Sequence, residues 1–349
     1  MSAFPDFFGN AHAADTLAQM MQGQRIPQTI LLSGPEGIGK ATLVRRFAAA
    51  LLGGAEKIEL DDLSLPQNVE LVEQREKWPA EKRADDPLLF GNHPDFLTFA
   101  PDGPLGQISI QQMRLLRERA PFMPLKGSHR IFLIDHLDHA NEQAANSLLK
   151  VLEEPPEQLI IFATAENVYD LLPTIRSRSV VLPMRRLSDE EMQEFAQARK
   201  LPDASARITL SAGSPGVAAT LDLEQFRERR ALLLAAFECA CGLILWPAWV
   251  QHSESFAARK SEKLDFYLKP AYSILEDVLK VLHGRPPEMH RDILQRIEAL
   301  SERIDYRWIE KAVHATDELV LMVRRNIQKL AALDAMIINL RNHAILART

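Results

Sequence analysis

The chain has 349 residues and a net charge of −6, and these two properties already exclude several kinds of protein. Its length exceeds that of one typical hydrophobic core and predicts two or three domains. Hydrophobic residues make up 46% and charged residues 25% of the chain, as in ordinary soluble globular proteins. The acidic balance argues against avid, independent binding to nucleic acid.

The cysteines and the first residues bear on where the protein works. Cys239 and Cys241 are too few for a disulfide framework, and a C-x-C pair alone is a poor metal site. No run of the chain approaches the ~18 apolar residues that a membrane span needs. Residues 1–10 lack the basic start and apolar run of a signal peptide. We therefore expect a cytoplasmic protein with reduced cysteines and no membrane contact.

Short apolar runs alternate with helical patterns through the first half of the chain. Such alternation predicts a parallel β-sheet covered by helices. Ser109 and Gln112 form a capping-box pattern, which predicts that a helix begins there. The predicted strands are residues 29–32, 96–99, 130–135, 159–163 and 180–182.

Two regions depart from this alternation. Residues 54–92 are polar, rich in acids and interrupted by prolines, which predicts a mobile surface insertion, with partner binding as the alternative. After Arg185 helical periodicity takes over, and it predicts a small helical segment over 186–223 and an all-helical domain over 224–349. Near the end lies an apolar stripe that suits core packing or association with another subunit: Leu319, Val323, Ile327, Leu330, Ile337 and Leu340.

A phosphate-binding loop follows the first predicted strand. Residues 34–40 read Gly-Pro-Glu-Gly-Ile-Gly-Lys and match the pattern G-x-x-x-x-G-K-[ST] up to its last position. In this pattern the loop amides cradle phosphates, the lysine reaches the β- and γ-phosphates, and the final hydroxyl binds Mg²⁺. Ala41 stands at the final position and offers no oxygen. We expect weak binding of ATP or ADP and poor Mg²⁺-dependent hydrolysis, unless Thr42 replaces the missing hydroxyl.

The acidic end of the third predicted strand is the second candidate feature. Asp135 fits the role of the carboxylate that holds Mg²⁺. His136 follows it at the position of the glutamate base of an active enzyme of this kind, which indicates a lost base. Asp138 is the nearest remaining acid. The predicted nucleotide-binding residues are Gly34, Pro35, Glu36, Gly37, Ile38, Gly39, Lys40, Ala41, Thr42 and Asp135.

The third feature is an arginine-containing turn before the last predicted strand. Residues 171–179 read LLPTIRSRS, and residues 145–156 read ANSLLKVLEEPP. With the phosphate loop and the Asp135 strand, these motifs have the order and spacing of the clamp-loader ATPases of the AAA+ class. The chain resembles this family from at least Ile26 to Leu187. His93-Pro94-Asp95 and the run GQISIQQMRLL make it most similar to the delta-prime branch of bacterial DNA polymerase III clamp loaders.

The resemblance implies an architecture and a role. It implies an AAA+ domain over 1–185, a helical lid over 186–223 and a helical collar over 224–349 that joins the subunits of a ring. It implies that Arg178 acts in trans on ATP held by a neighbouring ATPase subunit. Further implied partners are a delta-type subunit and, through the assembly, the sliding clamp and primed DNA. Gly216 replaces the arginine of the family's Gly-Ser-x-Arg motif, so the resemblance implies a stator with little or no hydrolysis.

Two departures and two alternatives complete the interpretation. The family's four-cysteine zinc module has no counterpart, since 54–92 contains no cysteine, and we expect neither zinc nor another metal site. The family's Ser-Arg-Cys turn appears as residues 177–179, Ser-Arg-Ser. An active AAA+ ATPase subunit is one alternative, opposed by Ala41, His136 and Gly216. A nucleotide-responsive scaffold outside replication is the other, and it leaves the LLKVLEEPP and SRS motifs to coincidence.

Overall fold

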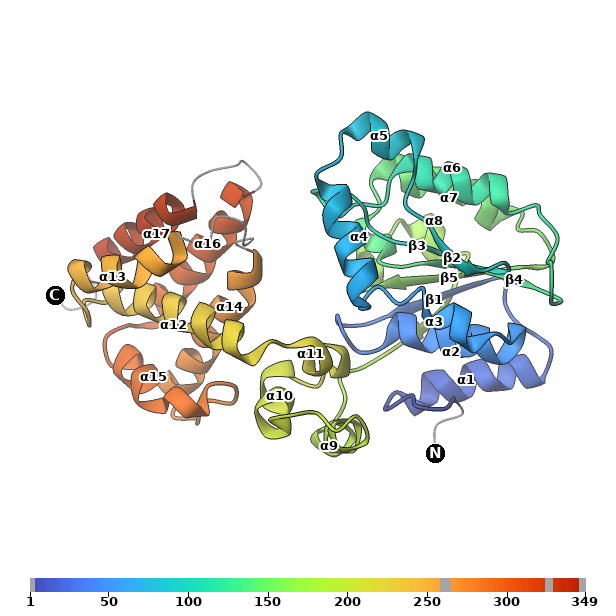
Figure 1. The fold of residues 1–349 in the computed structure, drawn as a ribbon. Coiled ribbons are helices and arrows are strands. Elements are labelled where there is room, and N and C mark those ends of the chain that lie inside the picture. The colour runs from blue at the N-terminus through green and yellow to red at the C-terminus, as the bar shows by residue number, and fades with distance from the viewer. Residues whose placement is uncertain (1–3, 258–264, 324–328, 345–349) are drawn as a thin grey trace. The chain divides into compact units, whose positions relative to one another are not determined.

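The chain folds into two compact units, residues 1–220 and 221–349, each with its own hydrophobic core (Figure 1). The structure is a computed structural model, and it describes residues 4–257, 265–323 and 329–344. The three helices that follow residue 186 belong to the first unit. The division into three domains therefore stays a prediction, and below we treat the two units separately.

A six-stranded sheet forms the centre of the first unit, in the order β2-β3-β4-β5-β1-β6. Every neighbouring pair is parallel except β2 with β3. This arrangement confirms the predicted α/β fold class. The sequence missed β2 because Gly91 and Asn92 give it little strand character. The strands are β1 (Thr29–Ser33), β2 (Phe90–His93), β3 (Phe96–Phe99), β4 (Arg130–Ile134), β5 (Leu159–Ala165) and β6 (Val180–Pro183).

Helices cover both faces of this sheet (Figure 1). Side chains alternate between the faces of a strand, so Ile30 and Leu32 pack on one side and Leu31 on the other. Each such fully buried side chain contributes about 2 kcal/mol of transfer free energy. The first face is covered by α1 (Ala11–Gln22) and α2 (Lys40–Leu52). The opposite face is covered by α6 (Ile110–Arg119) and α7 (Glu142–Glu153), with the short α8 (Pro173–Arg176) beside them.

The segment 54–92, which the sequence predicts to be a mobile surface insertion, is mostly helical. Its helices are α3 (Ala55–Glu59), α4 (Pro66–Glu76) and α5 (Ala80–Asp85). Buried arginines connect them to the rest of the unit: Arg45 of α2 pairs with Asp62 at 2.6 Å, and Arg75 of α4 pairs with Asp102 at 2.8 Å. These partners are far apart in the sequence, so local composition could not reveal them.

Three helices complete the first unit. A capping box of Ser188 and Glu191 begins the first of them, as the change to helical periodicity predicts. Leu187, Met192 and Phe195 bury themselves against Ala218 and form a small apolar cluster of their own. The helices are α9 (Asp189–Ala198), α10 (Ala204–Ser211) and α11 (Pro215–Thr220).

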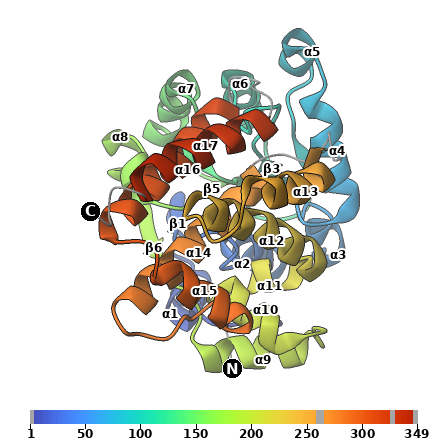
Figure 2. The ribbon, with the colours of Figure 1, turned by 90° about the vertical axis from the view of Figure 1, so that its left-hand side faces the viewer.

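The second unit is helical throughout its described residues. Phe237, Trp249 and Trp308 are its largest buried side chains. The last two helices run side by side (Figure 2). No helix in the described part of the chain is long and apolar enough to cross a membrane. The helices are α12 (Leu223–Ala240), α13 (Trp246–Ala257), α14 (Asp265–Leu282), α15 (Leu294–Ser301), α16 (Tyr306–Val323) and α17 (Lys329–Ala344).

The predicted apolar stripe lies on the last two of these helices. Leu319, Ile337 and Leu340 are buried in the core of the second unit, and Leu330 packs against it. Ile327 and the side chain of Val323 lie outside the described residues. The described part of the stripe therefore packs within its own unit.

Candidate functional site

The phosphate loop connects the end of β1 to the beginning of α2. Gly34 has a φ of 149°, and a side chain there would meet the Met184 carbonyl oxygen at 2.2 Å. Only glycine allows this close approach to the chain that follows β6. The helix α2 begins at Lys40, so its first free amides face the loop. A helix N-terminus with such a loop is suited to binding an anionic phosphate group.

The side chain of Lys40 is hydrogen-bonded to its own phosphate loop. Its Nζ donates to the carbonyl oxygens of Gly34 at 2.6 Å and Pro35 at 2.8 Å, and the residue is only 5% exposed. Burial lowers the pKa of Lys40, and the carboxylate of Asp135 opposes that shift. The ammonium has three N–H groups, so a phosphate that binds here finds one of them free and competes with the loop carbonyls for the other two. This competition weakens any phosphate contact of Lys40.

The structure places no hydroxyl at the metal position of the loop. Ala41 packs against the apolar core beneath α2. The hydroxyl of Thr42, one position further, accepts a hydrogen bond from Arg45 Nη2 at 3.4 Å. Thr42 is therefore hydrogen-bonded within its own helix. This arrangement does not support the idea that its hydroxyl replaces the missing Mg²⁺ ligand.

Asp135 follows β4 directly, one residue beyond the end of the strand that the sequence predicted to include it. Its Oδ1 accepts a hydrogen bond from the Thr164 hydroxyl at 2.6 Å. The same hydroxyl oxygen accepts from the backbone amide of His136 at 2.8 Å. Thr164, buried on β5, thus orients the carboxylate. The sequence analysis missed this residue, although a lone threonine in the apolar run 159–165 was a usable signal.

His136 lies at the position where a base was expected, and Asp138 is the nearest remaining acid. His136 has a left-handed backbone with a φ of 55°. Asp138 Oδ2 accepts a hydrogen bond from the backbone amide of Glu166, just after β5, at 2.8 Å. Asp135, Glu166 and Asp138 all act on the pKa of Lys40, so this edge of the sheet carries a concentrated negative charge around one ammonium.

The beginning of α11 rests on the phosphate loop. The amide of Gly216 donates to the Gly37 carbonyl oxygen at 2.7 Å. A side chain added at Gly216 would meet that oxygen at 2.9 Å, and one added at Gly37 would meet the Val217 side chain at 2.8 Å. An arginine at position 216 is incompatible with this contact unless the backbone moves. Gly216, where the resemblance implies an arginine, therefore allows α11 to contact the phosphate loop closely.

Arg178 lies on the turn between α8 and β6. Its Nη2 pairs with Glu153 Oε1 at 3.0 Å and its Nη1 donates to the Thr174 carbonyl oxygen at 3.1 Å. The side chain is 35% exposed, and within the described residues its hydrogen bonds do not reach the phosphate loop. Arg176, the competing arginine, stacks over the ring of Tyr169 at 5.2 Å instead. The turn that carries Arg178 and the motif that contains Glu153 are separate in the sequence, and this ion pair brings them into contact.

These features define a class of protein. A phosphate loop between β1 and α2 and a mostly parallel sheet flanked by helices are the arrangement of phosphate-loop α/β proteins. A family model described as "DNA polymerase III, delta subunit" matches residues 9–188, more than half of the chain. The chain belongs to this family of clamp-loader subunits.

Individual relatives agree with this assignment. DNA polymerase III subunit delta' of Pseudomonas aeruginosa is 32% identical over 210 residues, 58% of this chain and 57% of that protein. The Bacillus subtilis delta' subunit is 29% identical over 230 residues, 64% of this chain and 62% of that protein. Subunit gamma/tau of Mycobacterium tuberculosis is 30% identical over 203 residues, 55% of this chain and 30% of that protein.

A DNA polymerase III gamma subunit-related protein of Thermotoga maritima has a TM-score of 0.45 at 19% identity, covering 94% of this chain and 99% of that chain. The matches to the curated relatives above span between 30% and 62% of those proteins' length.

Proposed function

We propose that this chain is a stator subunit of a DNA polymerase III clamp loader. It joins a ring with ATPase subunits and a delta-type subunit, through the second unit and the face that carries Arg178. In that ring it supplies Arg178 to ATP on a neighbour and helps to load the sliding clamp on primed DNA. Contact with DNA is shared by the assembly and directed at the phosphate backbone, in keeping with the acidic net charge of −6.

The observation that carries the stator role is the self-engaged phosphate loop. Lys40 is bonded to two carbonyls of its own loop, and Ala41 gives no oxygen to a metal. The Gly216 amide meets the loop where the family's ATPase subunits have an arginine. These features support weak binding of ATP or ADP with little or no hydrolysis, and they oppose the alternative of an active ATPase subunit.

The position of Arg178 supports its action on a neighbour. Its guanidinium is partly exposed and held by Glu153, so it is oriented by an ion pair that an incoming phosphate can replace. An arginine supplied in trans stabilises the charge that develops on the transferred phosphoryl group. The proposed target is therefore the γ-phosphate of ATP on the adjacent subunit, and no residue of this chain's own loop is needed for the step.

The test is Arg178→Ala in a clamp loader reconstituted with normal subunit stoichiometry. We expect the variant to join the complex, while ATP turnover at the adjacent site falls by as much as ~10³. Other sites dilute that loss, so clamp loading on primed DNA is the more sensitive measurement. The isolated wild-type chain, assayed in parallel with Mg²⁺ and primed DNA, should release phosphate far more slowly than ~1 s⁻¹.

Arg176→Ala is the matched control, because Arg176 lies on the same turn but stacks on Tyr169. Its effect on clamp loading should be the milder one. Unchanged ATP turnover and clamp loading with Arg178→Ala would refute the trans-acting role. Turnover by the isolated chain in the ordinary enzyme range would refute the stator role and favour the active ATPase.

A further inference from the structure

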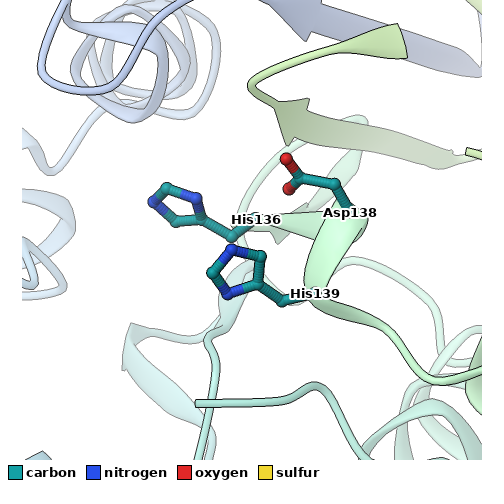
Figure 3. Close-up of side chains that lie close together, drawn as sticks. All are labelled: His136, Asp138 and His139. Atoms are coloured by element: carbon teal, nitrogen blue, oxygen red, sulfur yellow. The ribbon is translucent and has the colours of Figure 1, made fainter. Parts of the chain in front are cut away.

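Three side chains with metal-binding atoms project from the turn after Asp135 (Figure 3). His136 precedes the 3₁₀ turn η1 (Leu137–His139), and the His139 amide donates to the His136 carbonyl oxygen at 2.9 Å. Residues i and i+3 eclipse in such a turn, so the two imidazole rings lie together, 5.2 Å between centroids. Leu137 is buried in the core beneath and anchors the turn.

The ligand atoms of these residues converge. One ring nitrogen from each histidine and one carboxylate oxygen of Asp138 all lie within 4.8 Å of one another. His136 Nδ1 and Asp138 Oδ1 are buried and have no hydrogen-bond partner. Buried polar atoms are nearly always paired in native structures, so two such atoms in one turn require an explanation. A bound cation would account for both.

His139 is oriented as metal-binding histidines usually are. Its Nδ1 lies 3.1 Å from the Gly106 carbonyl oxygen. A carbonyl only accepts, so Nδ1 carries the proton and Nε2 holds the free lone pair. In zinc-binding histidines, the ring nitrogen that does not bind the metal commonly donates to a backbone carbonyl. This hydrogen bond fixes the tautomer and the orientation of the ring.

We propose that His136, Asp138 and His139 form a binding site for a divalent transition-metal ion, and that Zn²⁺ fits it best. Two imidazoles and one carboxylate suit zinc, whereas Mg²⁺ and Ca²⁺ prefer oxygen ligands alone. Zinc bonds of about 2.1 Å require ligand atoms about 3.4 Å apart in a tetrahedral site, so the three side chains, whose ligand atoms lie within 4.8 Å of one another, have to close around the ion. Three protein ligands leave the fourth position to water.

This proposal replaces the expectation of no metal, which was based on the missing cysteines of 54–92. The test of this proposal is separate from that of the proposed function, since zinc affinity is measured without Arg178, a neighbouring subunit or ATP turnover. The Cys239–Cys241 pair is a poor competitor for zinc, because burial raises the pKa of both thiols and disfavours the thiolates that bind metal.

The experiment uses the full chain without a histidine tag, stripped of metal with a chelator. Zn²⁺ is titrated in competition with a chromophoric chelator, and Co²⁺ is added separately as a spectroscopic probe. We expect one equivalent of Zn²⁺ to bind with micromolar or tighter affinity. The visible absorption of bound Co²⁺ should have the intensity of a four- or five-coordinate site.

Two variants and one control make the result specific. His139→Ala changes an exposed residue, and we expect it to weaken zinc binding at least ~10-fold, the scale at which even outer-shell groups act. His136→Gln should do the same. His12→Ala removes an exposed histidine of α1 and should leave the affinity unchanged. No zinc bound to the wild-type chain, or wild-type affinity in both site variants, overturns the proposal.

Discussion

The two units differ in how completely their polar side chains are hydrogen-bonded, as one buried and one half-buried aspartate show. In the second unit, Asp277 on α14 accepts hydrogen bonds from three successive backbone amides, those of residues 288–290, at 2.8–2.9 Å. At the sheet edge of the first unit, Asp138 accepts a single backbone hydrogen bond, and its other oxygen is buried without a partner. Both carboxylates accept hydrogen bonds from backbone amides, but only Asp277 has hydrogen-bond partners for both of its oxygens.

One histidine close to each of these aspartates shows the same contrast. His290, fully buried, receives a hydrogen bond from Arg230 at Nδ1 at 3.4 Å, and its Nε2 lies 2.9 Å from the Ser273 hydroxyl. Since that hydroxyl donates to the Pro270 carbonyl oxygen, it accepts from His290. His136 has a buried ring nitrogen with no such partner. One ring is built into a core, and the other is available to a ligand.

This difference in hydrogen bonding indicates which unit has polar groups that are free to bind a ligand. All buried side-chain atoms without a partner among the described residues belong to the first unit. Full pairing rigidifies a core and leaves nothing to offer a ligand. Unpaired groups raise the free energy of the folded state until something binds them. Two of these atoms, His136 Nδ1 and Asp138 Oδ1, follow β4 at the sheet edge, whereas the described core of the second unit contains none.

The strongest way to test this comparison is Asp277→Asn. The amide group of asparagine would face at least one of the three backbone donors, and the charged acceptor would be lost. We expect the free energy of unfolding of the second unit to fall by about 3 kcal/mol. Urea unfolding followed by tryptophan fluorescence measures it, because Trp246, Trp249 and Trp308 lie in this unit.

The control for this substitution lies next to it on α14. Glu276 pairs with Lys280 at the surface, and its side chain is 58% exposed. Glu276→Gln should change the free energy of unfolding by no more than about 0.5 kcal/mol. Equal effects of the two substitutions would show that the backbone hydrogen bonds of Asp277 do not stabilise the unit.

A second prediction concerns pH. Burial, and next the nearby Arg230, lower the pKa of His290 to about 4, from 6.5 in the unfolded chain, against the opposing charges of Asp277 and Asp292. Above pH 6.5 the ring is neutral in both states. Between pH 6.5 and 4 the unfolded state binds the proton that the folded state refuses, so the free energy of unfolding falls as pH falls. The full difference is about 3 kcal/mol.

Urea unfolding of the wild-type chain and of His290→Gln at pH 7 and pH 4.5 measures this contribution. Glutamine does not titrate, so the variant should be less stable at pH 7 but should lose less between the two pH values. The same pH dependence in both proteins would mean that other groups cause the acid sensitivity.

The smallest effect is expected from Asp138→Asn, the same substitution at the unsatisfied site. Asparagine can still accept the hydrogen bond from the Glu166 amide, and the other carboxylate oxygen has no hydrogen-bond partner to lose. We expect a change in stability within about 0.5 kcal/mol, measured by hydrogen exchange of the β4 and β5 amides. A loss as large as that of Asp277→Asn would break the comparison between the two units.

The sequence by itself determined the features that depend on close neighbours along the chain. The phosphate loop, the five parallel strands and the capping box of Ser109 and Gln112 were all readable, because glycines, β-branched runs and caps act within a few residues. The departures from the expected motifs at Ala41, His136 and Gly216 were readable too, since each motif has a fixed pattern.

The tertiary structure alone decided which of these parts touch. Gly216 meets Gly37, Arg178 meets Glu153, and Thr164 orients Asp135 across pairs that are well separated in the sequence. The turn that gathers His136, Asp138 and His139 depends on Leu137 being buried in a core made by distant strands and helices. Such contacts follow from side-chain packing between elements, which local patterns do not encode.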